Sequence, residues 1–232
     1  MARVSAIIPA FNEADTIAAT IAAVKRISAV DEIIVVDDGS PDNTAEYAEK
    51  AGAANVLVLE KNVGKGGALM AGIEAASGDI LLFLDADLGD SASHSLPLVQ
   101  AVLDDETDMA IAILPTVQLK GGSRSGGFGM VLRLARWGIR SLTGRTMKAP
   151  LSGQRALRRD IVKRLGGFDR GFGIEVGLTV DALLRGYRVE EIPAPLTHRA
   201  TGRDVKGFIH RGRQFADVLA ALLRRAFAKK KL

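Results

Sequence analysis

The stretch Asp79-Ile80-Leu81-Leu82-Phe83-Leu84-Asp85-Ala86-Asp87 ends an apolar run in two carboxylates. The run predicts a strand buried on both faces, as in a parallel sheet covered by helices. Ligands bind open α/β sheets at the carboxyl ends of the strands, so Asp85 and Asp87 are expected beside a ligand. Residues two apart in a strand point the same way, and two such carboxylates repel unless a cation lies between them. The stretch predicts either a clamp for Mg²⁺ and a diphosphate or, taken alone, a solvated turn.

Strand and helix patterns alternate on both sides of this stretch, in repeated βαβ order. They predict an α/β fold with a doubly wound, mostly parallel sheet and helices on both faces. Asn12, with Asp15 three residues later, is expected to cap the first helix. The other segments expected to be regular are strands at 4–9, 32–36, 56–59, 108–114 and 188–192, and helices at 44–51, 66–76, 95–103, 128–142, 175–184 and 207–227.

The chain is expected to form a single domain, residues 1–232, because it shows no internal repeat and no Ser/Pro-rich linker. Its first half, 1–115, has the pattern of a nucleotide-binding unit. The second half, 116–204, begins with a Gly/Ser-rich segment at 121–127 that is a candidate lid. A basic amphipathic helix, 205–232, closes the chain.

Charge is distributed unevenly along the chain. The net charge is +4, but residues 199–232 hold ten Lys/Arg against two Asp, so residues 1–198 carry −4. This pattern excludes a general nucleic-acid surface. The absence of cysteine fits a reducing compartment, and no leader segment or long apolar span is visible, so a cytoplasmic protein is expected.

Three polar loops follow predicted strands in the first half. Residues 9–13 and 37–40 supply carboxylates and backbone groups that suit a nucleobase and a ribose, or serve only as turns and caps. Residues 62–67 open a helix, where backbone N–H groups and Lys65 could approach a diphosphate, although two glycines also suit a plain helix start.

In their order along the chain, these segments resemble family 2-type glycosyltransferases with the GT-A fold. The first half contributes Ile7–Glu13, Val35–Ser40, Asn62–Gly66 and Asp85–Asp87 to the resemblance. The second half is similar to the acceptor half of glucosyl-3-phosphoglycerate synthases and polyprenyl-phosphate sugar transferases, at Leu142–Arg145, Leu151–Arg155 and Gly173–Leu178. The chain is shorter than typical phosphoglycerate-linked enzymes. Residues 88–90 lack the polar residue that polyprenyl-phosphate enzymes often carry after Asp-x-Asp.

The resemblance implies a nucleotide-sugar-binding half at 1–115, an acceptor half at 116–204 and a bound Mn²⁺ or Mg²⁺. The metal ligands would be Asp85, Asp87 and His198. Gly153 and Gln154 would border the sugar and acceptor, Arg145 would bind an acceptor phosphate, and Arg203 either phosphate. The nucleotide sugar would contact Pro9, Ala10, Phe11, Glu13, Asp38, Lys65, Asp85 and Ala86.

Asp87, Glu175 and Asp181 are the residues expected to carry catalysis. Glu175 and Asp181 are six residues apart and lie on different flanks of an ideal helix, so at most one can face the site. If the reaction inverts configuration, that carboxylate is the base for an acceptor hydroxyl. If the reaction retains configuration, Glu175 would hydrogen-bond the donor sugar. An acceptor that is already a phosphate needs no base.

The resemblance therefore implies a metal-dependent enzyme that moves a sugar from a nucleotide sugar, with UDP-glucose or another UDP-sugar favoured. The leading acceptor is a small phosphorylated hydroxy acid such as 3-phosphoglycerate. The alternatives are a polyprenyl phosphate at the membrane surface, with a UDP- or GDP-sugar donor, and a nucleotide-sugar-binding protein without transfer. For the closing helix, the alternatives are peripheral contact with the inner face of the membrane, a homodimer contact or packing within the domain.

Overall fold

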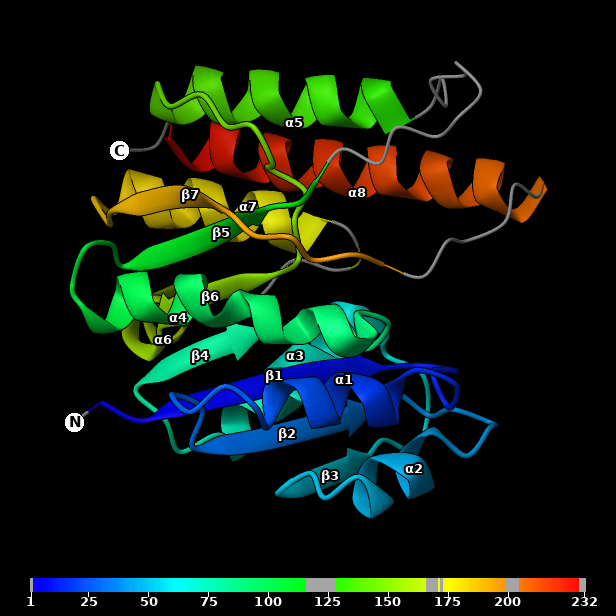
Figure 1. Cartoon of the computed structure of the whole chain (residues 1–232). Coiled ribbons are helices and arrows are strands. Elements are labelled where there is room, and N and C mark those ends of the chain that lie inside the picture. The colour runs from blue at the N-terminus through cyan, green and yellow to red at the C-terminus, as the bar shows by residue number, and fades with distance from the viewer. Residues whose placement is uncertain (1, 116–127, 166–170, 172, 199–204, 230–232) are drawn as a thin grey trace.

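A seven-stranded sheet with helices on both faces forms the body of the protein (Figure 1). The computed structural model describes residues 2–115, 128–165, 171, 173–198 and 205–229. The strands are β1 (Val4–Ala10), β2 (Glu32–Asp37), β3 (Asn55–Val58), β4 (Ile80–Phe83), β5 (Met109–Ile113), β6 (Arg155–Arg158) and β7 (Val189–Pro193). The helices are α1 (Ile17–Val24), α2 (Thr44–Lys50), α3 (Gly64–Ala75), α4 (Leu96–Leu103), α5 (Phe128–Thr143), α6 (Arg159–Leu165), α7 (Gly173–Leu184) and α8 (Val205–Lys229), with a 3₁₀ segment η1 (Gly89–Ser95) before α4.

The strand order is β3-β2-β1-β4-β6-β5-β7. β6 is antiparallel to β4 and β5, and the other neighbouring strands are parallel. Ala156 of β6 pairs with Leu82 on one side and with Ala110 on the other, so a strand from the second half of the chain completes the sheet of the first half. The predicted α/β class with a doubly wound, mostly parallel sheet is confirmed.

Alternating residues of the strands enter two hydrophobic cores. Ile8 and Leu82 belong to the core under α1 and α4, whereas Ile7 and Leu81 belong to the core under α3, α5 and α7. Successive side chains of a strand point to opposite faces, so a strand covered on both faces must be apolar throughout. This explains why the central strands read as uninterrupted apolar runs.

The first helix begins later than predicted. Asn12 does not cap it: Asn12 has a φ of 59°, in the left-handed region, and the helix starts at Ile17 after Thr16. The backbone N–H of Asn12 instead donates to Ser40 Oγ at 3.0 Å, which ties together the loops after β1 and β2. Asn tolerates this left-handed backbone better than most residues, so its side chain suits a turn here and not a cap.

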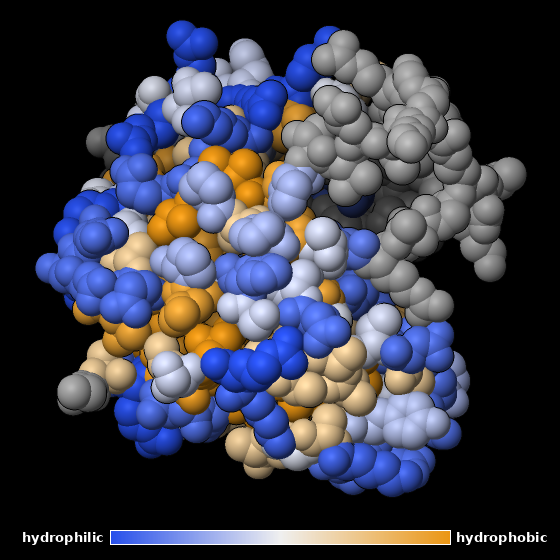
Figure 2. Space-filling model, in the orientation of Figure 1, coloured by the Kyte–Doolittle hydropathy of each residue, from blue (hydrophilic) through white to orange (hydrophobic). Residues whose placement is uncertain are grey.

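The helices α5 and α8 lie side by side at the end of the molecule farthest from β3 (Figure 1). Hydrophilic residues line the upper edge of the molecule in Figure 2, where α5 lies. Within the described residues, neither helix nor any other combines the length and apolar character needed to cross a bilayer. The candidate lid at 121–127 lies outside the described residues.

Candidate functional site

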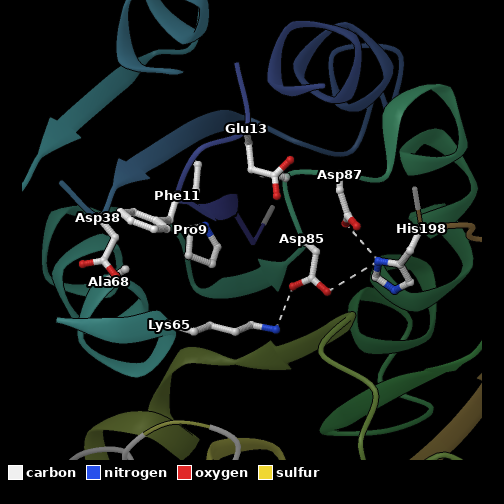
Figure 3. Close-up of a pocket in the computed structure, with 11 residues that line it drawn as sticks. Pro9, Phe11, Glu13, Asp38, Lys65, Ala68, Asp85, Asp87 and His198 are labelled. Carbon is white, nitrogen blue, oxygen red and sulfur yellow. Dashed lines mark hydrogen bonds and ion pairs between the residues drawn. The ribbon is translucent and has the colours of Figure 1, made fainter. Parts of the chain in front are cut away.

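Two aspartates and a histidine meet at the carboxyl end of β4. Asp85 and Asp87 follow the strand, and His198 lies after β7 (Figure 3). The Nδ1 atom of His198 is 2.9 Å from Asp87 Oδ1 and 3.9 Å from Asp85 Oδ2. One ligand atom from each of the three residues lies within 4.8 Å of the others, so they form a candidate metal site. Two carboxylates and an imidazole are a donor set that suits Mn²⁺ and also fits Mg²⁺.

The carboxylates change the pKa of this histidine. The hydrogen bond from His198 to Asp87, together with the charges of both aspartates, raises the pKa of His198, although burial acts in the opposite direction. A metal ion bound here would therefore have to displace a proton from His198, whose protonated form the two carboxylates stabilise.

Lys65 approaches Asp85 from the side opposite His198 (Figure 3). Its Nζ atom is 2.7 Å from Asp85 Oδ1 and 3.2 Å from Glu175 Oε1. Burial would lower the pKa of Lys65, but the charges of Asp85 and Glu175 outweigh this effect and raise it. Burial likewise raises the pKa of Asp85, and the charge of Lys65 more than offsets it and lowers that pKa. Lys65 and Asp85 are therefore both charged at neutral pH.

The start of α3 fixes the position of Lys65. Val63 at the N-cap makes no side-chain cap bond. Asp38, from the loop after β2, supplies that contact instead: its two carboxylate oxygens accept the N–H groups of Val63 and Gly64 at 2.7 and 2.8 Å. An acceptor at a helix N-terminus satisfies otherwise unpaired donors and matches the helix dipole. Asp38 thus positions the lysine, a role that the sequence did not predict.

A cavity of about 290 Å³ is lined by the residues predicted for the nucleotide sugar. The loop after β1, the start of α3 and the end of β4 form its walls (Figure 3). Its lining residues are Pro9, Ala10, Phe11, Glu13, Asp38, Lys65, Ala68, Asp85, Ala86, Asp87 and His198. All eight residues that the sequence assigned to the nucleotide sugar lie in this cavity, together with the metal cluster. Ala68 is the one lining residue that the sequence did not indicate.

Gly153 and Gln154 lie against the metal cluster. The Nε2 atom of Gln154 donates to Asp85 Oδ2 at 2.7 Å and lies 3.2 Å from His198 Nε2. A Cβ atom at Gly153 would overlap Lys65 Nζ and lie 3.3 Å from Asp85 Oδ1. A glycine at this position therefore leaves room for the lysine to reach Asp85.

A second cavity, of about 790 Å³, meets the first at Lys65, Asp85 and His198. Its polar lining includes Arg136, whose Nη2 donates to the carbonyl oxygen of Lys148 at 2.5 Å. The apolar lining residues are Ile113, Leu114, Val131, Leu132, Ala149 and Leu151. Arg136 and Lys148 were not predicted, because they come from two segments with no shared motif. An arginine inside the apolar pattern of α5 was the one available signal.

The predicted catalytic carboxylates are separated. Glu175 lines the second cavity and pairs with Lys65. Asp181, later in α7, pairs with Arg225 of α8 and with Arg185. Asp181 lines neither of the two cavities that meet at the metal cluster. The structure thus brings Glu175 to the candidate site and leaves Asp181 in a helix–helix contact.

Arg145 is also not brought to the site. Its guanidinium donates to the backbone of Val189 and to Glu190, 3.1 Å away, at the amino end of β7. His198 follows the carboxyl end of the same strand, so Arg145 and the candidate site lie at opposite ends of β7. Arg203 lies outside the described residues.

Arg155 is a buried residue that supports the loop next to the metal cluster. It is 1% exposed, and burial lowers its pKa to about 10. Its Nε donates to the carbonyl of Ser152 at 2.8 Å and its Nη1 donates to Thr179 Oγ1 at 2.9 Å. These bonds hold the loop that carries Gly153 and Gln154 against α7, the helix that carries Glu175.

The model of glycosyl transferase family 2 matches residues 5–166. The chain is 33% identical over 172 residues to an undecaprenyl-phosphate 4-deoxy-4-formamido-L-arabinose transferase of Serratia proteamaculans, covering 70% of this chain and 51% of that protein. It is 32% identical over 201 residues to the glucosyl-3-phosphoglycerate synthase of Mycolicibacterium paratuberculosis, covering 78% of this chain and 60% of that protein. The chain thus spans only about half to three fifths of the length of these relatives.

Solved structures of glucosyl-3-phosphoglycerate synthase from Mycobacterium tuberculosis share the fold. The complex with Mn²⁺, UDP and phosphoglyceric acid is 30% identical, with a TM-score of 0.77 over 97% of this chain and 78% of that chain. The complex with Mn²⁺, UDP-glucose and phosphoglyceric acid is 29% identical, with a TM-score of 0.79 over 97% of this chain and 79% of that chain.

Proposed function

The chain belongs to glycosyl transferase family 2 and has the GT-A fold, and from this premise we propose that it is a metal-dependent glycosyltransferase. Its donor would be a nucleotide sugar, with a UDP-sugar such as UDP-glucose favoured. Its acceptor would be a phosphorylated molecule bound in the second cavity. Residues 1–115 would bind the donor and residues 116–204 would contribute most of the acceptor site.

The observation that carries this proposal is the cluster of Asp85, Asp87 and His198 inside the cavity of the predicted donor residues. The three residues would hold Mn²⁺ or Mg²⁺, the ions bound with UDP in the structural neighbours. Such an ion would stabilise negative charge on the departing diphosphate.

The neighbouring side chains have complementary tasks. Lys65 carries a positive charge at the point where the two cavities meet, where it would contact a donor phosphate. Gln154 orients Asp85 and His198 through its amide. Glu175 is the carboxylate placed to hydrogen-bond the sugar or an acceptor hydroxyl.

Two acceptor classes have separate support. A small phosphorylated hydroxy acid, with 3-phosphoglycerate first, follows from the structural neighbours that bind phosphoglyceric acid. A polyprenyl phosphate follows from the undecaprenyl-phosphate relative and from the apolar walls of the second cavity. In either class, Arg136 and Lys148 provide positive charge for the phosphate. Within the described residues, the buried Ser152 hydroxyl in this cavity has no hydrogen-bond partner and could bind an acceptor oxygen.

The test is a UDP-release screen of UDP- and GDP-sugars against phosphoglycerate, glycerate and short polyprenyl phosphates, with and without Mn²⁺. Release is expected only with metal and a phosphorylated acceptor. Asp87→Ala should abolish it, whereas Asp90→Ala, which changes an exposed aspartate paired with Arg26, should leave it unchanged. Full activity in Asp87→Ala would refute the proposal. Donor binding that persists without metal, with no UDP release for any acceptor, would identify a nucleotide-sugar-binding protein instead.

A further inference from the structure

Helices α5 and α8 run in the same direction and pack closely along one seam (Figure 1). A Cβ atom at Gly138 of α5 would overlap the side chain of Leu222 of α8, so these two residues mark the line of closest approach. Successive residues of an α-helix are rotated by about 100° around its axis. In two parallel helices, the residue before Gly138 and the residue after Leu222 therefore point to the same side of the contact line. Trp137 and Leu223 therefore lie on one face.

This face is apolar and exposed. Trp137 is 66% exposed and Leu223 is 47% exposed. Met130 lies seven residues before Trp137 and Phe227 four residues after Leu223, so both continue the same helix faces, at 52% and 65% exposure. We call these four residues the α5–α8 face. An exposed apolar cluster of this kind marks a contact surface more often than it marks plain solvent exposure.

Arginines surround the α5–α8 face. Arg133 and Arg140 are exposed on α5, and Arg224 is exposed on α8. The sequences of the two helices contain nine Lys/Arg and one acidic residue, Asp217. The Asp217 carboxylate lies against Gly171, before α7.

We propose that the α5–α8 face docks on an anionic lipid bilayer, with Trp137 in the interfacial layer and the arginines at the lipid phosphates. An exposed tryptophan among basic side chains suits the boundary between headgroups and acyl chains. Anionic headgroups complement a helix pair that is almost free of acids. A twofold dimer through the same face would bring each arginine cluster close to its own copy, which disfavours a second chain as the occupant.

The proposal differs from the sequence-based expectation for α8 alone. Val218, Ala221 and Leu222 of its apolar stripe are buried in the core and unavailable to lipid. The exposed apolar surface is shared with α5, and its most exposed member, Trp137, belongs to that helix.

Trp137 is the only tryptophan of the chain, so its fluorescence reports on this face directly. The full chain would be titrated with phosphatidylcholine vesicles with and without phosphatidylglycerol. A blue shift of the emission and quenching by brominated lipid are expected on the anionic vesicles, with reversal at high salt. Arg133→Glu combined with Arg140→Glu should weaken vesicle binding at least about tenfold. The matched control, Arg26→Glu combined with Lys50→Glu, has the same net charge and should bind as the unmodified chain does.

No blue shift on anionic vesicles, or equal binding to neutral ones, would overturn the proposal. A blue shift that grows with protein concentration without lipid, together with a dimer mass in light scattering, would assign the face to a second copy. If circular dichroism shows that the variant with Arg133→Glu and Arg140→Glu does not fold, the test is whether high salt releases the unmodified chain from anionic vesicles. Binding that is unaffected by salt would then overturn the proposal.

Discussion

Lys65 Nζ lies 2.7 Å from Asp85 Oδ1, so a lysine of the donor cavity holds one of the proposed metal ligands. The other carboxylate oxygen of Asp85 accepts from Gln154 at 2.7 Å. Both oxygens are thus engaged by protein donors, and a cation bound through Oδ1 would replace the contact with the like-charged Lys65. A donor diphosphate that attracts Lys65 would free Asp85 Oδ1, which couples nucleotide binding to metal binding.

Lys65→Met should bind Mn²⁺ more tightly than the unmodified chain when no nucleotide is present, because the competing cation is gone. Removing its charge should also lower the rate of transfer by about 10²-fold or more. Calorimetry of Mn²⁺ binding with and without UDP would measure both the affinity and its coupling to the nucleotide. Lys61→Met, at an exposed neighbouring lysine, is the control. Equal Mn²⁺ affinity in the Lys65 variant and the unmodified chain would contradict this replacement.

Gly153→Ala should reduce activity more than it reduces stability. The new Cβ would overlap Lys65 Nζ, and the flexible end of the lysine can move away at small cost in folding free energy but not without leaving Asp85. The control is Gly129→Ala in α5, where a Cβ meets no atom within 4 Å. That change lies in the first turn of α5 and should leave both activity and stability close to those of the unmodified chain. Urea unfolding and steady-state kinetics on both variants separate the two effects.

Mn²⁺ binding should weaken as the pH falls through the pKa of His198. The pKa of this histidine is raised above its usual 6.5 by Asp87, so protons compete with the metal already above that pH. In the metal-free protein, the folding stability that His198 contributes changes with pH in the opposite direction. The protonated His198 contributes stability that is complete below pH 6.5 and is lost as the pH rises through the folded pKa. Calorimetric titrations across this range test the metal effect. His198→Gln should remove the pH dependence, and His94→Gln should keep it.

Arg188→Met should lower the stability of the fold at neutral pH and make that stability less dependent on pH in the acid range. Hydrogen bonds from Arg188 lower the pKa of both Asp105 and Asp108. Depressed carboxyl pKa values contribute stability that is present above about pH 3.8 and is lost as the pH falls through the folded values. The variant should therefore be less stable than the unmodified chain at neutral pH, and the difference should vanish in strong acid. Urea midpoints at several pH values measure it. Arg26→Met, in an exposed pair with Asp90, should show little change.

Local sequence patterns predicted most of the fold. The apolar runs at 4–9, 32–36 and 80–84 can bury all their side chains only in strands that are covered on both faces. The structure shows buried strands at these positions. The start of α1 was not predictable from the cap pattern, because the backbone of Asn12 is set by a bond to Ser40, a residue of another loop. The place of β6 between β4 and β5 was likewise not readable, since pairing partners are long-range.

By itself, the sequence determined which carboxylates would stand at the end of β4, because strand geometry and the edge at which ligands bind follow from local pattern. Only the tertiary structure decided that His198 reaches them, that Glu175 and not Asp181 pairs with Lys65, and that Arg145 and the candidate site lie at opposite ends of β7. The physical reason is that these contacts depend on how whole elements pack. A side chain's helical or strand period fixes its direction, but the distance to a partner many residues away is set by the folded core.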